Sequence, residues 1–285
     1  MMRPDLRSRI AGLRAWPGWA LLIATAAISY STAESESLSK SAATDGRFLT
    51  SAIRTSARVL PADARQLVLV TTPDWNSTKA TLQTFTRAAD GWHSATAPAP
   101  VVIGRAGAAW GIGLNPPQDG TQKREGDGRS PAGMFSIGTA FGYAAAEKTQ
   151  WPYAALSADD YCIDVDGSPL YNRIVDAGKV GAAAVAGSTE PMRRDLHSGG
   201  DQAYKLGFVI AHNPRGTAGA GSCIFAHLWK SPESTTAGCT AMAEPVMQTL
   251  VAWLRPQDHP VFVLLPAAEY KRLKAAWDLP DLAPR

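Results

Sequence analysis

The chain has 285 residues, and its 28 Lys and Arg against 25 Asp and Glu leave a formal net charge of only +3. This length and an ordinary globular composition are enough to bury the core of one large domain. Positive and negative residues are nearly balanced, and the sequence shows no cluster of basic residues, so a nucleic-acid partner is not expected.

The first 33 residues have the pattern of a secretory signal peptide. Four Arg residues precede an apolar run from Trp16 to Ile28, and Ser31-Thr32-Ala33 forms a small-residue cleavage site. The run is too short for a comfortable membrane span, so we expect export and cleavage, which place the mature protein in the periplasm or outside the cell. If the leader stays uncleaved, it is expected to act as a membrane tether.

Residues 34–60 are rich in Ser, Thr and Ala and show no strong apolar periodicity. They are expected to form a linker or a short helix packed on the domain. The length of this segment suits a tether between the leader and a folded domain.

Short β-branched and apolar runs, separated by Gly, Pro, Asn and Asp, predict a mainly β fold. The first strand is predicted at 67–72, between Pro61 and Pro73, and a polar, hairpin-like return follows towards Trp92. Further strands are predicted at 101–104, 109–114, 133–137, 161–166, 206–211, 223–229 and 261–265.

One helix is predicted from Pro245 to Leu254, where apolar residues recur at helical spacing and Pro245 suits the first turn. This helix follows Cys239 closely. We therefore expect the positive end of its dipole to lower the pKa of that thiol.

A Cys and a His flank one short loop in the C-terminal third of the chain. Attack on a carbonyl needs a thiolate, a base and backbone N–H groups for the oxyanion. Cys239 is the candidate nucleophile and His227 the candidate base, while Gly238 lets the backbone approach a substrate with its amides exposed. On spacing alone, a buried Cys and a core His explain the pattern equally well.

Three blocks carry a resemblance to a known family. Phe-x-His followed by a short loop and Thr-x-Gly-Cys-Thr-Ala-Met, at 225–227 and 236–242, resembles the active-site block of the L,D-transpeptidases, bacterial cysteine enzymes that cross-link peptidoglycan. The run 129–135 is similar to the Thr-Pro-x-Gly hairpin of that family, and 171–173 resembles a block of one bacterial branch. The sequence departs from the commoner pattern at Ala237, where the family has His, and at 240–242, where an Arg or Asn is usual.

The resemblance covers roughly residues 61–270 and implies an L,D-transpeptidase-like β-sandwich or barrel with a few short helices, followed by a C-terminal tail at 271–285. It implies that Cys239 attacks the bond between the third and fourth residues of a peptidoglycan tetrapeptide stem, and that an amine acceptor resolves the acyl-enzyme in cell wall biogenesis and cross-linking. His227 carries the protons and is oriented by a backbone carbonyl. No metal or cofactor is implied.

Two other functions fit the same residues. An L,D-carboxypeptidase or a cross-link hydrolase would use water as the acceptor with the same Cys–His pair. A secreted peptidoglycan-binding protein would keep the fold, and its Cys and His would be only structural.

Four residues near the pair or upstream of it are candidates for substrate binding. Thr236 and Ala237 directly precede the Gly-Cys pair, and Trp229 lies two residues after His227, so strand alternation puts both on one face. Trp229 packing under the loop is the alternative. Arg173 suits a stem carboxylate, with an ion pair to Asp164 or Asp166 as the alternative.

His212 and Arg129 are two further candidates. His212 is placed either in the cleft near the pair or as a structural His before a turn. Arg129 is placed either on a hairpin at the cleft edge or as a solvated charge on a turn.

An exported chain with three Cys leaves one unpaired. With Cys239 as the free thiol, Cys162 and Cys223 are the expected disulfide, and two buried free thiols are the alternative. No Cys-x-x-Cys occurs and the five His show no ligand spacing, so no metal site is expected.

Overall fold

The computed structural model describes residues 60–282. The predicted signal peptide at 1–33, and all of the predicted linker except Leu60, lie outside the described residues. Leu60 itself is buried in the core. No helix within 60–282 is long and apolar enough to cross a membrane.

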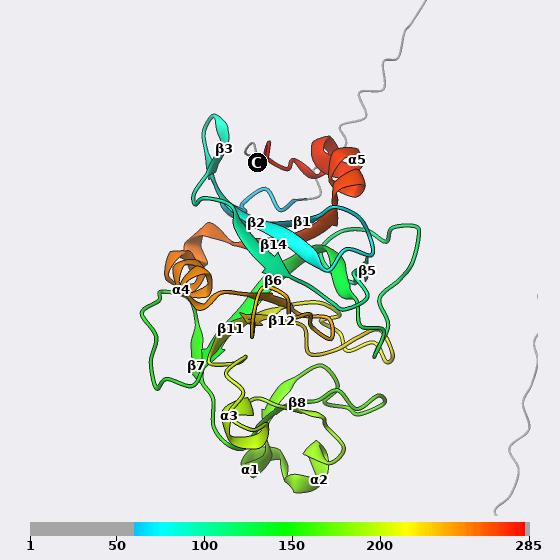
Figure 1. Cartoon of the computed structure of the whole chain (residues 1–285), viewed down its shortest axis with the longest axis vertical. Helices are drawn as coiled ribbons and strands as arrows, with labels where there is room; N and C mark the ends of the chain where they lie inside the picture. The colour runs from blue at the N-terminus through cyan, green and yellow to red at the C-terminus, as the bar shows by residue number, and fades with distance from the viewer. Residues whose placement is uncertain (1–59, 283–285) are drawn as a thin grey trace, which may run out of the picture. The chain divides into compact units, whose positions relative to one another are not determined.

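A closed eight-stranded β-barrel forms the centre of the described domain (Figure 1). Its strands pair in the order β1, β14, β6, β11, β12, β13, β4, β2, and β2 returns to β1. Their bounds are Gln66–Thr72 (β1), Lys79–Ala88 (β2), Ala99–Val102 (β4), Ser130–Gly142 (β6), Leu206–Ile210 (β11), Phe225–Leu228 (β12), Thr240–Met242 (β13) and Val261–Pro266 (β14). The prediction of a mainly β barrel-type fold with few helices is confirmed.

β1 and β14 pair in parallel and are buried along their whole length. Residues 67–70 of β1 and 261–265 of β14 are continuous apolar runs, because each strand is covered on two faces. Helix α5 (Ala267–Trp277) packs on these strands and buries Tyr270, Leu273 and Trp277. Residues 271–277 of the expected tail therefore lie in α5, whose last turns belong to the core.

Most of the predicted strands are present, with shifted ends. The polar return after β1 is the hairpin of β2 and β3 (Gly91–Ser94). The strand predicted at 109–114 is only β5 (Ala108–Trp110), which pairs with β6, and the strand at 161–166 is only β8 (Asp160–Cys162). The very short β7 (Tyr153–Ala155), β9 (Ile174–Asp176) and β10 (Glu190–Pro191) were not predicted.

Helix α4 (Glu244–Trp253) confirms the helix predicted at 245–254, with Ala243 as its N-cap residue. Strand β13 lies between Cys239 and this helix, however. The expectation that the nucleophile comes just before a helix is therefore wrong, and the helix dipole gives no reason for a lowered thiol pKa.

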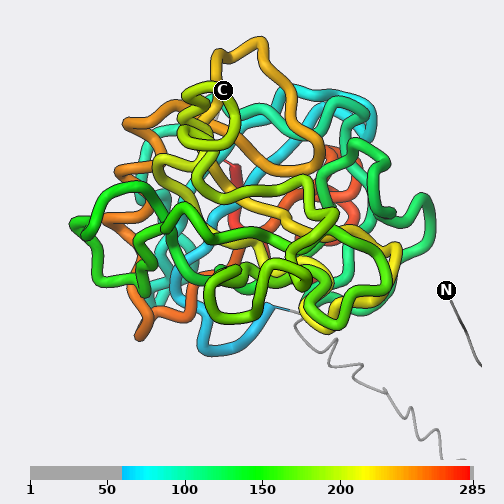
Figure 2. Tube along the Cα trace, turned by 90° about the horizontal axis from the view of Figure 1, so that it is seen from below, coloured from blue at the N-terminus to red at the C-terminus, as the bar shows by residue number. Residues whose placement is uncertain are grey.

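Residues 156–203, which we call the insert, separate β7 from β11 and lie on one side of the barrel (Figures 1 and 2). The insert contains the small sheet β10-β8-β9 and three one-turn helices, α1 (Ala177–Val180), α2 (Ala182–Val185) and α3 (Arg194–His197). A disulfide joins Cys162 at the end of β8 to Cys223, just before β12, with their Cα atoms 5.9 Å apart. The expected pairing is confirmed, and it fastens the insert to the barrel.

Candidate active site

A cavity of ≈ 1060 Å³ lies where the insert meets the barrel. The barrel side contributes the end of β12 and the loop that leads to β13, with His227 and Cys239. The insert contributes Glu190, Arg194 and the segment 198–203. Both candidate catalytic residues therefore line one cavity.

Cys239 comes directly before β13, and its thiol is buried, with the residue only 7% exposed. The N–H of Phe225 donates to Sγ across 3.3 Å, and the thiol donates to the carbonyl oxygen of Cys223 across 3.5 Å. Burial raises the pKa of Cys239 to about 12, and the negative charge of Glu190 adds to this. The expected lowering of this thiol pKa is therefore wrong: in the free protein Cys239 is a neutral thiol.

His227 lies on β12, next to β13 in a parallel pair. Its Nδ1 lies 2.8 Å from the carbonyl oxygen of Leu228, so Nδ1 carries the proton and Nε2 has a free lone pair. The ring of Tyr204 packs edge-on against the imidazole at 5.3 Å. Burial lowers the pKa of His227 to about 4, which keeps it neutral and able to accept a proton. The backbone carbonyl expected to orient this base is present.

Two hydroxyl groups hold the main chain at Cys239. Ser130 Oγ and Thr236 Oγ1 donate to the carbonyl oxygen of Cys239 across 2.9 and 2.6 Å. The N–H of Gly238 donates to Thr236 Oγ1 at 3.1 Å, so this amide is not exposed as expected. Close packing favours glycine here, because a Cβ atom at position 238 would lie 3.0 Å from the carbonyl oxygen of Arg129.

Three of the predicted substrate-binding residues line the cavity: Trp229, Thr236 and Ala237. Arg173 does not line it and is exposed elsewhere. Among the described residues, Arg173 forms no ion pair with Asp164 or Asp166. The carboxylates of these two residues accept hydrogen bonds from Thr189 and Gly219 instead.

His212 and Arg129 also lie outside the cavity lining. The N–H of Ile112 donates to His212 Nδ1 at 3.2 Å, and His212 Nε2 lies 2.8 Å from the carbonyl oxygen of Ala220, so this buried His is structural. The guanidinium of Arg129 donates to the carbonyl oxygens of Ala108 and Trp75 at 2.9 and 3.2 Å. It holds the turn to the barrel and does not face a substrate.

Sequence reasoning missed a polar network on the insert side of the cavity. Tyr204, fully packed under His227, donates to Glu190 Oε1 at 2.7 Å. Arg194 binds Glu190 at 3.3 Å and Asp201 at 2.8 Å. These residues carry no shared motif, and only the i,i+4 spacing of Glu190 and Arg194 indicates a contact.

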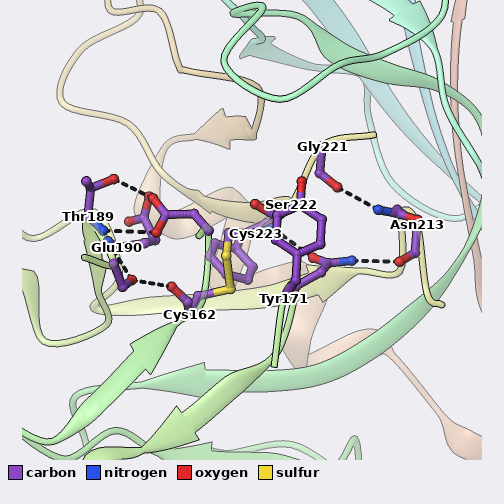
Figure 3. Close-up of a disulfide and its surroundings, with 12 residues drawn as sticks. Cys162, Tyr171, Thr189, Glu190, Asn213, Gly221, Ser222 and Cys223 are labelled. Atoms are coloured by element: carbon purple, nitrogen blue, oxygen red, sulfur yellow. Dashed lines mark hydrogen bonds between the residues drawn. A yellow bond between two sulfur atoms is a disulfide. The ribbon is translucent and has the colours of Figure 1, made fainter. Parts of the chain in front are cut away.

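Residues 171–173 contact the segment that carries the disulfide and do not line the cavity. Figure 3 shows Tyr171 and Ser222 beside Cys223, and the hydroxyls of both donate to one carboxylate oxygen of Glu125. Asn172 Oδ1 accepts the backbone N–H of Cys223 at 2.8 Å. The block therefore fixes the segment that leads into β12.

The site is built from Cys, His, hydroxyl and charged side chains. Within residues 60–282 no group of three or more His, Cys, Asp and Glu is arranged to hold a metal ion. Comparisons with family models, with curated proteins and with solved structures found no match for this chain.

Proposed function

We propose that this protein is an exported L,D-transpeptidase that acts on peptidoglycan stem peptides through an acyl-enzyme on Cys239. The observation that carries the proposal is the pair itself. A single free thiol and an imidazole with an open Nε2 line the same cavity, and the carbonyl of Leu228 fixes the imidazole tautomer. The eight-stranded barrel and the three sequence blocks support an L,D-transpeptidase fold.

The resting pair is neutral, so the proton moves during attack. As Sγ of Cys239 adds to the stem carbonyl, Nε2 of His227 takes the thiol proton. The imidazolium then gives this proton to the leaving amine of the terminal residue, and the thioester remains. The incoming acceptor amine loses its proton to Nε2 as it attacks, the C–S bond breaks, and the imidazolium returns that proton to the sulfur, which restores the thiol.

The charge of the cavity suits a substrate that carries both signs. Its lining holds four cationic side chains, Arg105, Lys123, Arg194 and Lys230, and four anionic ones, Glu125, Asp164, Glu190 and Asp201. A stem peptide has carboxylates and an amine, and complementary charges orient such a ligand. The volume of ≈ 1060 Å³ also exceeds the needs of a single amino acid and suits a peptide.

Export is part of the proposal, because peptidoglycan lies outside the cytoplasm. The Cys162–Cys223 disulfide supports this, since disulfides persist in oxidising compartments. The leader-like first 33 residues agree with the same route. The periplasm or the cell exterior is therefore the proposed location.

The test incubates the mature protein with tetrapeptide muropeptides and analyses the products and the intact protein by mass spectrometry. A stem-derived adduct on Cys239 and cross-linked dimers are expected. Tripeptide products without dimers would indicate a carboxypeptidase, and loss of existing cross-links would indicate a hydrolase. Absence of both adduct and products contradicts the enzyme and leaves a binding protein.

Cys239→Ser is the matched control. The serine hydroxyl can replace both hydrogen bonds of the thiol, to Phe225 and Cys223, so the fold should be retained, whereas turnover should be abolished because a hydroxyl is far harder to ionise. Substantial transfer by a folded Cys239→Ser protein would exclude Cys239 as the nucleophile.

A further inference from the structure

Lys123 is a buried lysine on the cavity wall that the proposed mechanism does not use. It lies in the loop between β5 and β6, and its side chain is only 3% exposed. A Cβ atom on Gly221 would lie 3.1 Å from Lys123 Cγ, and one on Gly238 would lie 3.7 Å from Lys123 Cε. The aliphatic stem therefore packs against two glycines, one directly before Cys239 and the other two residues before Cys223.

Among the described residues, one carboxylate, that of Asp127, pairs with the ammonium of Lys123. Nζ donates to Asp127 Oδ1 and to the carbonyl oxygen of Arg124, both at 2.6 Å. The third N–H of the ammonium has no protein acceptor within residues 60–282. Asp127 also accepts the backbone N–H groups of Arg124 and Arg129, so its negative charge is shared with two further donors.

Two other charged groups that act on Cys239 come from the insert. Glu190 disfavours a thiolate there, and Arg194 favours one. Arg194 is already bound by two carboxylates, those of Glu190 at 3.3 Å and Asp201 at 2.8 Å. These two carboxylates therefore neutralise most of the positive charge of Arg194 and weaken its effect on the sulfur.

Tyr204 packs in one hydrophobic cluster with Cys239, and His227 lines the same cavity; both are uncharged near neutral pH. Burial lowers the pKa of His227 to about 4 and raises that of Tyr204. Lys123 is then the least compensated cation beside Cys239. We propose that Lys123 is a positioning residue that stabilises the thiolate of Cys239 through its charge. Its catalytic value rests on the proposed function, but its effect on the sulfur needs no substrate.

The test measures the rate at which iodoacetamide alkylates the unreduced protein between about pH 7 and 10. Cys239 is the one thiol outside the disulfide, so the label reports on it alone. Below the pKa of a thiol, its alkylation rate follows the thiolate fraction. A nearby opposite charge lowers the pKa of a thiol by about one unit or more. A shift of about one unit changes the thiolate fraction, and therefore the alkylation rate, about tenfold.

Lys123→Met should therefore slow alkylation about tenfold, and Lys123→Arg should keep most of the rate. Asp127→Asn should speed alkylation, because it removes the charge that compensates Lys123. Lys179→Met is the matched control, since Lys179 is an exposed lysine paired with Asp176 and lies outside the cavity lining. Thermal unfolding verifies that each variant is folded.

A folded Lys123→Met protein that is alkylated within twofold of the wild-type rate overturns the proposal. Rates that move in the same direction in Lys123→Met and Asp127→Asn also overturn it, because they would indicate loosened packing and not charge. If Lys123→Met does not fold, Asp127→Asn decides: unchanged or slower alkylation contradicts the role of Lys123. If the alkylation rates are as expected but the wild type transfers no stem peptide, the role of Lys123 stands and the proposed function is contradicted.

Discussion

The buried hydroxyl of Ser130 donates a hydrogen bond to the carbonyl oxygen of Cys239 across 2.9 Å and accepts one from the N–H of Gly104 at the same distance. Ser130 is the first residue of β6 and is fully buried. One side chain thus connects the long central strand, the segment just after β4 and the main chain at Cys239. The position of the thiol is set by the barrel through this contact.

Ser130→Ala should destabilise the protein by about 1–3 kcal/mol, because it leaves the buried N–H of Gly104 without an acceptor. It should also slow acylation, since the carbonyl of Cys239 keeps only its bond from Thr236. Urea unfolding measures the first effect and the rate of adduct formation the second. Thr236→Ala removes the other donor and is the comparison. A Ser130→Ala protein with unchanged unfolding free energy would show that the contact is not formed.

His227→Ala and His212→Ala should fail in different ways. Loss of His227 removes the base and should slow acylation by roughly two to four orders of magnitude. Loss of His212 should instead lower the unfolding free energy by about 1–3 kcal/mol, because the N–H of Ile112 and the carbonyl of Ala220 lose their partner. Adduct formation and urea unfolding are measured on both variants. Equal rate losses, or a larger one at His212, would overturn these roles.

The same two histidines predict a loss of stability in acid. Burial lowers the pKa of each to about 4, below the unfolded value of about 6.5, so the unfolded chain binds more protons between these limits. Their contribution is complete above about pH 6.5 and is lost as the pH falls to about 4. The unfolding free energy should rise with pH across this range, and the slope should be smaller in His212→Gln than in the wild type. His93→Gln is the control, because His93 is an exposed surface residue, and its slope should equal that of the wild type. An identical slope in all three proteins would contradict buried neutral histidines.

Local patterns in the sequence predicted the strong elements and missed the weak ones. The β-branched run at 67–72 and the apolar spacing at 245–254 became β1 and α4 because each has its own propensity and period. Helix α5 was missed although Tyr270, Leu273 and Trp277 lie at helical spacing, since charged and small residues surround them. β13 has three residues, too few for any period, yet it separates Cys239 from the expected helix.

The chemistry of the site could be predicted only in part. His227 and Cys239 were singled out because they flank one loop, and both line one cavity. The environment of the thiol could not be read from nearby residues, because Tyr204, Glu190 and Lys123 come from distant segments that folding brings together. The prediction of an acidic thiol failed for this reason: it considered the helix that follows and not the burial.

The disulfide joins the insert to the residue that accepts the thiol hydrogen of Cys239. Cys223 has a left-handed backbone conformation, with φ 54°, and its carbonyl oxygen lies 3.5 Å from Sγ of Cys239. Cys162, Cys223 and Cys239 pack in one small hydrophobic cluster with Tyr204 and Phe225. The bond closes a loop across a sequence separation of 61, which in the chain-entropy account is worth about 4 kcal/mol.

Protein exported to the periplasm should therefore contain the Cys162–Cys223 bridge and one free thiol, that of Cys239. Peptide mapping without reduction tests the pairing, and urea unfolding tests a loss of about 4 kcal/mol in a Cys162→Ala, Cys223→Ala protein. Adduct formation should fall as well, because the freed insert no longer fixes the cavity wall or the carbonyl of Cys223. A Cys223–Cys239 bridge as the main species would contradict the assigned nucleophile. If the double variant keeps full stability and activity, the strand pairing of the small sheet and the contacts of the insert with the barrel hold the insert in place without the disulfide.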